Sequence, residues 1–139
     1  MTRVLFLCTH NSCRSQMAEA LMNHLAGDKI TASSAGTKPA SVHPLAVRVL
    51  QELGIDTVRL RSKGLEEFGG QEFDYAITLC ANAEQSCPVF LGKTKRAHIG
   101  FEDPAKAVGS EEEKLAVFRR VRDEIEERLS AFFKQEGVL

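Results

Sequence analysis

Two cysteine-containing segments, each directly after an apolar run, hold the residues of this chain best suited to chemistry. The first is Cys8-Thr9-His10-Asn11-Ser12-Cys13-Arg14-Ser15, after Val4–Leu7, and the second runs from Cys80 to Cys87, after Tyr75–Leu79. In open α/β sheets, functional groups lie where strands end and loops begin. We therefore predict a site at these two strand ends, with thiol chemistry on a phosphate-like oxyanion.

The first segment has the composition of an anion-binding loop between a strand and a helix. Its backbone N–H groups and the N-terminus of the following helix attract negative charge. Arg14 follows Cys8 after five residues, and its planar guanidinium can hold two oxygens of a tetrahedral anion. In this setting we predict that the pKa of Cys8 falls below its usual value. Ser15 is expected to donate to the thiolate, and Asn11 to adopt a positive φ.

The predicted substrate-binding segment comprises Thr9, His10, Asn11, Ser12, Cys13, Arg14 and Ser15. Within it, Cys13 is expected to face the helix or the core, because unpaired cysteines are usually buried as small apolar side chains. His10 is expected to be solvated and is given no catalytic role.

The second segment places Cys80 and Cys87 seven positions apart. If the segment is helical, two turns separate their Cα atoms by roughly 10 Å, whereas a disulfide needs them within about 7 Å. A bond between them therefore requires the helix to unwind, which would present the disulfide to an outside reductant. Zinc binding with His98 or His10 is an alternative, but the six-residue gap is wider than is usual for such sites. We expect no metal.

A candidate acid follows the last predicted strand, in Phe101-Glu102-Asp103-Pro104. Attack of a thiolate on an oxyanion requires an acid that protonates the departing oxygen. An Asp-Pro pair alone is a common turn signal, but beside Cys8 and Arg14 it favours Asp103 as that acid.

Alternating strand and helix patterns position these residues. Apolar and β-branched runs predict strands at Val4–Leu7, Ile30–Ser34, Tyr75–Leu79 and Arg96–Ile99. Helical spacing predicts helices at Ser15–Leu25 and His43–Leu53, and a third, longest one opened by a capping box of Ser110 and Glu113. The buried stripe of this third helix is predicted to comprise Leu115, Phe118, Val121, Ile125, Leu129 and Phe132. We predict one α/β domain over residues 1–139, with three layers and a four-stranded parallel sheet flanked by helices.

The composition excludes several classes of protein. The chain has 139 residues, of which 43% are hydrophobic and 27% charged, and this is typical of a soluble globular domain. A net charge of -1 gives no reason to expect nucleic acid or a membrane surface as a partner. We see no signal-peptide pattern and no apolar run long enough to span a membrane, so we expect a cytoplasmic protein. In that compartment four cysteines are not expected to form a static disulfide framework.

Taken together, these motifs make the chain similar to a known family. The Cys-x5-Arg-Ser loop, Asp103-Pro104 and the alternation of four strands resemble the low-molecular-weight protein tyrosine phosphatase fold. The Cys80/Cys87 pair and the run from Asn11 to Glu19 resemble the thioredoxin-coupled arsenate reductases of that fold. The resemblance covers nearly the whole chain.

The resemblance implies a three-thiol relay that reduces arsenate to arsenite. Cys8 would attack arsenate in the loop, with Arg14 binding the anion and Asp103 acting as acid. Cys80 would then attack Cys8, and Cys87 would attack Cys80, so the final disulfide joins Cys80 to Cys87. The implied partner is thioredoxin, and no cofactor is implied. We expect a monomer.

Two positions depart from the family pattern: Ile99 stands where relatives often carry Trp, and Lys63 departs near the loop. Relatives with a potassium site near the loop use an Asn, a Glu, a Ser and an Asp; Asn11, Glu19 and Ser34 match, but Lys63 stands where the Asp is expected. The ammonium group can take the place of the cation, so we predict little or no potassium dependence.

Three alternatives stay open at this point. The chain could be a tyrosine phosphatase, although Ala105-Lys106-Ala107 offers no aromatic platform for a phosphotyrosine. It could be an arsenate reductase that uses glutathione and glutaredoxin. It could also be a non-catalytic oxyanion sensor or redox switch, which would not need Cys8, Arg14 and Asp103 together.

Overall fold

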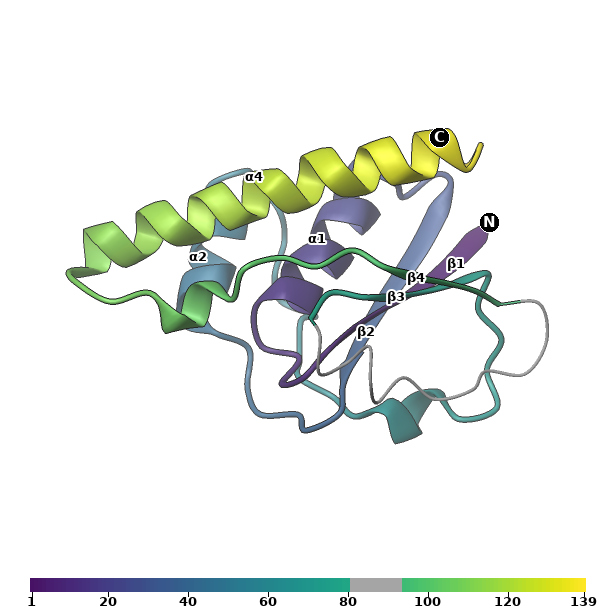
Figure 1. The fold of residues 1–139 in the computed structure, drawn as a ribbon, viewed down its shortest axis with the longest axis horizontal. Helices are drawn as coiled ribbons and strands as arrows, with labels where there is room; N and C mark the ends of the chain where they lie inside the picture. Colours follow the sequence, from purple (N-terminus) through teal and green to yellow (C-terminus); the bar gives the residue numbers. More distant parts are fainter. Residues whose placement is uncertain (81–93) are drawn as a thin grey trace.

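A four-stranded parallel sheet with the strand order β2-β1-β3-β4 forms the centre of the computed structural model (Figure 1), which describes residues 1–80 and 94–139. The strands span Thr2–Cys8 (β1), Ile30–Gly36 (β2), Tyr75–Thr78 (β3) and Lys95–His98 (β4). Every neighbouring pair is parallel. The fully buried run Val4–Leu7 lies in β1, as expected for a strand with neighbours on both sides. The predicted α/β fold class is confirmed.

Within residues 1–80 and 94–139, three α-helices pack against one another, and the first of them also packs against β1 and β2. They span Arg14–Ala26 (α1), Pro44–Gln51 (α2) and Glu111–Gln135 (α4), and two short 3-10 helices span Leu65–Phe68 (η1) and Pro104–Lys106 (η2). In Figure 1 the long helix α4 crosses above α1 and α2, while η1 lies on the far side of the strands. Among the described residues, no helix is long and apolar enough to cross a membrane.

Local signals placed the helix ends well. Pro44 occupies the first turn of α2, and the side chain of His43 caps that helix by accepting from the Leu45 N–H. The capping box of Ser110 and Glu113 at the start of α4 is present in both directions.

Several element bounds differ from the sequence prediction by one or two residues, and the differences in β2 and α4 have a clear physical reason. Strand β2 continues to Gly36 instead of ending at Ser34, because Gly36 pairs with Cys8 at the end of β1. The buried stripe of α4 ends at Phe133 and not at Phe132, which is only partly buried. Phe133 lies four residues after Leu129 and stays on the buried face. The rings of both Phe132 and Phe133 pack against the ring of Tyr75.

The topology brings the two cysteine segments to the same edge of the sheet. Strands β1 and β3 are neighbours in register, with Leu7 opposite Thr78. Because the strands are parallel, Cys8 and Cys80 follow the carboxyl ends of adjacent strands. From β1 the chain passes to β2 on one side and later to β3 on the other, so β1 and β3 flank the switch point of the sheet, where ligands of open α/β folds bind.

Candidate active site

The loop between β1 and α1 forms one wall of a cavity of about 260 Å³. Its lining residues come from this loop, from the segment after β2 and from the segment after β4: Cys8, His10, Ser12, Cys13, Arg14, Ala40, Ser41, Asp103 and Ala105. Cys13 is the N-cap of α1 and makes no side-chain capping bond, so no side chain of the cap occupies the N–H groups of the first turn. The cavity therefore combines a buried cysteine, a guanidinium and uncapped helix N–H groups, a combination that suits an anion.

Asn11 gives the loop its shape. Its φ is 49°, the positive value predicted from the sequence, and its side chain is fully buried. Asn11 Nδ2 donates to Ser15 Oγ at 2.7 Å and to Ser34 Oγ at 2.9 Å, while Asn11 Oδ1 accepts from Gln16 Nε2 at 2.9 Å and from the Lys63 backbone N–H at 2.9 Å. Asn11 thus holds the loop from behind and does not line the cavity.

Arg14 is the first residue of α1 and is held by the segment after β4. Its Nη1 donates to the Phe101 carbonyl at 3.1 Å, and its Nη2 lies 3.7 Å from Asp103 Oδ2. Its buried Nε has no hydrogen-bond partner among the described residues. Since a buried donor without a partner is costly, this N–H is suited to an oxygen of a bound anion. Asp103 lies on the same side, where an acid is needed.

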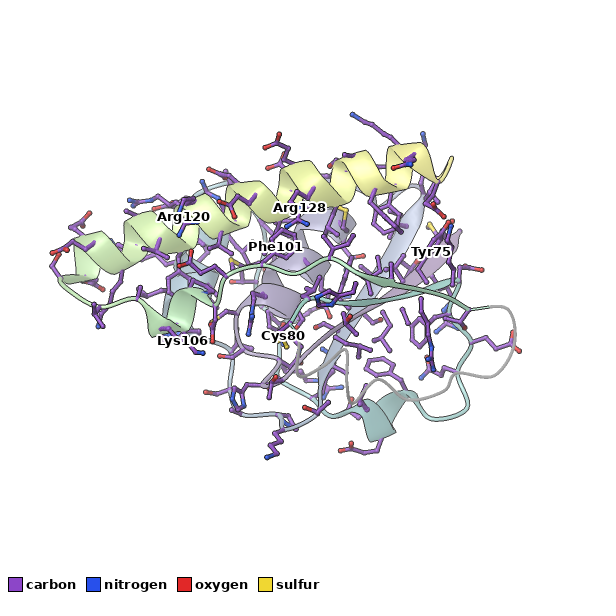
Figure 2. The ribbon with its side chains drawn as sticks, viewed as in Figure 1. Tyr75, Cys80, Phe101, Lys106, Arg120 and Arg128 are labelled. Carbon is purple, nitrogen blue, oxygen red and sulfur yellow. The ribbon has the colours of Figure 1, made fainter. Side chains whose placement is uncertain are left out.

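Helix α4 anchors the segment that carries Asp103. Arg128 Nη1 donates to the Gly100 carbonyl at 2.7 Å, and its guanidinium lies 4.8 Å from the centre of the Phe101 ring. Arg120 pairs with Glu102. Figure 2 shows Arg128 and Arg120 on α4 facing this segment, with Phe101 beneath Arg128. A backbone held at two points of a long helix, by side chains eight residues apart, gives Asp103 a defined position beside Arg14.

The side chain of Cys8, which lines the cavity, contacts that of Cys80, which does not line it. Both are buried, Cys8 is hydrogen-bonded to Cys80, and Cys80 Sγ lies 3.2 Å from Thr9 Oγ1. Figure 2 places Cys80 near the start of α1, where the loop turns into the helix.

The predicted lowering of the Cys8 pKa is wrong for this structure. The hydrogen bond with Cys80 is the largest influence and raises the pKa, and burial raises it further. Hydrogen bonds from Ser15 and the charge of Arg14 lower it, as the sequence led us to expect, but they do not outweigh the two raising effects. The sequence prediction considered only the loop around Cys8 and left out Cys80, which lies 72 positions further along the chain.

Cys13 is buried as predicted, yet it also lines the cavity. Burial raises the pKa of its thiol to about 12, and the negative charge of Asp103 adds to the rise. Both effects favour the protonated form of the Cys13 thiol.

Lys63, the residue that stands in place of the family's Asp, forms an ion pair with Glu19. Its Nζ is 3.3 Å from Glu19 Oε1 and 3.1 Å from the Arg61 carbonyl. Glu19 Oε1 also accepts from Ser34 Oγ at 2.9 Å. Since Ser34 is bonded to Asn11, the ion pair of Lys63 and Glu19 joins the network that holds the loop from behind.

The structure brings together most of the predicted site residues but not all. Cys8, His10, Ser12, Cys13, Arg14 and Asp103 line the cavity. Three of the predicted residues do not line the cavity. Thr9 is bonded to Cys80, Asn11 to Ser34, and Ser15 to Cys8. Cys87, and with it the question of a helix between the two cysteines, lies outside the described residues.

The sequence prediction missed two groups that hold the site in place. Buried Gln16 donates to Asn11 and to the Arg61 carbonyl, and its only signal is a polar residue on the inner face of an amphipathic helix. The Phe101 carbonyl, which holds Arg14, is a backbone atom and leaves no signal. Across residues 1–80 and 94–139, no group of three or more His, Cys, Asp or Glu side chains is placed to hold a metal ion.

Comparison with known proteins identifies relatives over nearly the whole chain. The model of the family described as "Low molecular weight phosphotyrosine protein phosphatase" matches residues 3–137. Arsenate reductases of Halalkalibacterium halodurans and Bacillus subtilis are 46% and 45% identical over 129 residues, which is 93% of this chain and 93% of each relative.

Solved structures agree with this result. A thioredoxin-dependent arsenate reductase of Corynebacterium glutamicum is 30% identical with a TM-score of 0.72, over 97% of this chain and 61% of that one. A low molecular weight protein tyrosine phosphatase of T. tengcongensis is 26% identical with a TM-score of 0.79, over 97% of this chain and 99% of that one.

Proposed function

This chain belongs to the low molecular weight phosphotyrosine protein phosphatase family, and from that premise we propose that it is an arsenate reductase with a three-cysteine relay regenerated by thioredoxin. The names of its relatives, which include arsenate reductases and a thioredoxin-dependent one, support the substrate and the reductant.

The contact between Cys8 and Cys80 is the observation that carries the proposal. A phosphatase needs one nucleophile, because water resolves its covalent intermediate. Here a second thiol, that of Cys80, is hydrogen-bonded to Cys8, and Cys8 lines a cavity together with Arg14 and Asp103. Reduction of As(V) to As(III) takes two electrons, the number that two thiols release when they form one disulfide.

In the first step, arsenate lies in the loop, with its oxygens on the backbone N–H groups and on Arg14. Cys8 gives its proton to an oxygen of arsenate and its sulfur attacks arsenic, so that a sulfur–arsenic bond forms. One arsenic–oxygen bond breaks, and Asp103 gives that oxygen a proton so that it leaves as water. Arsenic remains As(V) in this adduct.

In the second step, Cys80 gives its proton to an oxygen bound to arsenic, and its sulfur attacks the sulfur of Cys8. A disulfide forms, the sulfur–arsenic bond breaks, and its electron pair stays on arsenic, which leaves as arsenite. The two sulfurs are oxidised and arsenic is reduced by two electrons. The hydrogen bond between the two side chains places the attacking sulfur next to the sulfur that it attacks.

In the third step, Cys87 attacks Cys80 and frees Cys8 as a thiol. The disulfide then joins Cys80 to Cys87 and is reduced by the dithiol of thioredoxin. Glutathione with glutaredoxin is the alternative reductant.

The test is arsenate-dependent NADPH oxidation with thioredoxin and thioredoxin reductase. We expect steady turnover by wild type, none by Cys8→Ser or Cys80→Ser, and at most one turnover by Cys87→Ser. Cys13→Ser is the matched control and should retain turnover, since none of the three proposed steps uses the Cys13 thiol. Turnover that requires glutathione and glutaredoxin would replace thioredoxin in the proposal. Steady turnover by Cys87→Ser would remove the third thiol.

Hydrolysis of aryl phosphates is a second candidate activity, favoured by the likeness to the T. tengcongensis phosphatase. Phosphate and arsenate are similar in shape and charge, so the same loop suits both. Ala40 and Ala105 line the cavity beside Asp103, and neither offers a ring for an aromatic substrate to stack on. We therefore expect slow hydrolysis of p-nitrophenyl phosphate. Rapid hydrolysis, together with no arsenate-dependent turnover, would make the protein a phosphatase.

A further inference from the structure

The side chain of His10 belongs to the cavity, yet the proposed reaction gives it no part. It lines the cavity with Cys8, Arg14 and Asp103, and it is exposed, whereas Cys8 is buried. His10 therefore stands at the solvent side of the cavity, and the reacting sulfur at its base.

The ring of His10 is held in one orientation. Its Nδ1 lies 3.1 Å from the Lys38 carbonyl. A carbonyl oxygen can only accept, so Nδ1 carries a proton and donates it. The second nitrogen, Nε2, has no partner in the part of the chain that the structure describes. With Nδ1 protonated, Nε2 can accept a hydrogen bond when the imidazole ring is neutral and can donate one when the ring is charged.

The backbone around His10 is fixed as well. Its carbonyl accepts from the Ala40 N–H at 3.1 Å and from Ser62 Oγ at 2.9 Å. One residue earlier, the Thr9 carbonyl accepts from the Lys38 N–H at 2.8 Å. The loop is thus joined to segment 38–40 on both sides of the ring, so the position of Nε2 is set before any ligand binds. Groups positioned in advance bind with a smaller entropic cost.

The chemistry of the oxyanion gives this nitrogen a role. Partly protonated arsenate and phosphate carry both bare oxygens and a hydroxyl. Arg14 and the backbone N–H groups can only donate, so they serve the bare oxygens. A neutral imidazole can accept from the hydroxyl, and a charged one can donate to an oxygen; in both states Nε2 has a bond to make.

We propose that His10 is a substrate-binding residue whose Nε2 bonds to an oxygen on the solvent side of the bound oxyanion. The residue acts on oxyanion affinity and leaves the thiol steps unchanged. The proposal rests on the proposed function in so far as arsenate is the oxyanion, but binding of inorganic phosphate tests it without any turnover.

Two substitutions separate the nitrogens of the ring. The amide nitrogen of asparagine can take the place of Nδ1, so His10→Asn keeps the bond to the Lys38 carbonyl and removes Nε2. Glutamine reaches the place of Nε2, so His10→Gln keeps a polar group toward the cavity and gives up the bond to Lys38. His24 is an exposed histidine on α1 that lines a different cavity, and His24→Asn is the matched control.

The dissociation constant of inorganic phosphate is measured by calorimetry for each reduced protein, and KM and kcat for arsenate by NADPH oxidation. A hydrogen bond to a charged group predicts about a tenfold weaker phosphate affinity in His10→Asn. We expect a similar rise in KM, kcat within about twofold, a smaller loss in His10→Gln and none in His24→Asn.

Unchanged phosphate affinity in His10→Asn would overturn the proposal. So would a loss in His10→Gln at least as large as in His10→Asn, because the ring would then serve only to hold Lys38. A wild-type protein that binds phosphate but shows no arsenate turnover would refute the proposed function and leave the phosphate test of His10 intact.

Discussion

Replacing Lys63 by methionine removes a positive charge from the network behind the anion-binding loop and keeps most of the side chain's length. Lys63 and Glu19 are close to fully buried, with side-chain exposures of 9% and 13%, and their charged atoms lie 3.3 Å apart. In Lys63→Met the carboxylate of Glu19 loses its partner and keeps only the hydroxyl of Ser34.

The magnitude follows from this geometry. At 3.3 Å and an effective dielectric constant of about 20, the attraction between two unit charges is about 5 kcal/mol. Desolvation offsets part of it, and removal of one partner of a buried pair typically costs about 3–5 kcal/mol. Because both side chains keep some exposure, we expect a loss of about 2–3 kcal/mol, which lowers the Tm of a domain of this size by about 6–12 °C.

The assay combines thermal unfolding with kcat/KM for arsenate, each in KCl and in NaCl at equal ionic strength. For wild type we expect the same values in both salts, because the ammonium group occupies the place of a cation. Lys63→Asp adds a second carboxylate beside Glu19 and makes an oxygen-rich site of the kind that hard cations prefer. This variant should be less stable in NaCl and recover part of its Tm in KCl. Lys29→Met, at an exposed lysine, is the control.

Two results would refute the reasoning. A clear gain in wild-type activity with potassium over sodium would show that the ammonium group does not replace the cation. A Tm of Lys63→Met equal to that of the Lys29→Met control would show that the buried ion pair does not stabilise the loop.

Three further predictions concern the cysteines and the loop. Cys80→Ala removes the largest influence that raises the pKa of Cys8, so alkylation of Cys8 by iodoacetamide should shift to lower pH by about one unit, and an unchanged midpoint would contradict this. Cys13 has a folded-state pKa of about 12 against a usual 9.0, so the folded state holds its proton longer and stability falls as pH rises through this window. Urea unfolding at pH 8 and pH 10 should show a loss about 1 kcal/mol larger in wild type than in Cys13→Ala. In Gly36→Ala the new Cβ would lie 2.6 Å from the Thr9 carbonyl oxygen, so the loop must move, and kcat/KM should fall about 100-fold while far-UV circular dichroism stays unchanged.

Structural features that depend only on residues close together in the chain could be predicted from the sequence. The apolar runs of the strands, the positive φ of Asn11, and the capping box of Ser110 with Glu113 are all confirmed. Each depends on a few consecutive side chains and on the conformations that these side chains permit. The proximity of Asp103 to Arg14 was also expected, because both follow strands whose carboxyl ends lie at one edge of a parallel sheet.

Features that depend on distant partners could not be predicted in this way. The pKa of Cys8 is set first by Cys80, which only the pairing of β1 with β3 brings near. The position of Arg14 depends on the carbonyl of Phe101, an atom that every residue has. The inward turn of Phe133 in place of Phe132 depends on how the long helix α4 lies over the sheet, which periodicity resolves only to within one residue.

The adjacency of β1 and β3 also bears on how activities diverge within one family. The loop that we propose to bind the anion follows β1, and the second thiol follows the neighbouring strand, so neither interrupts the other's segment. A substitution after β3 can therefore add or remove a thiol beside an intact anion site. A protein with this fold can therefore evolve from hydrolysis to thiol transfer, or in the reverse direction. The proteins along such a path keep their ability to bind tetrahedral oxyanions.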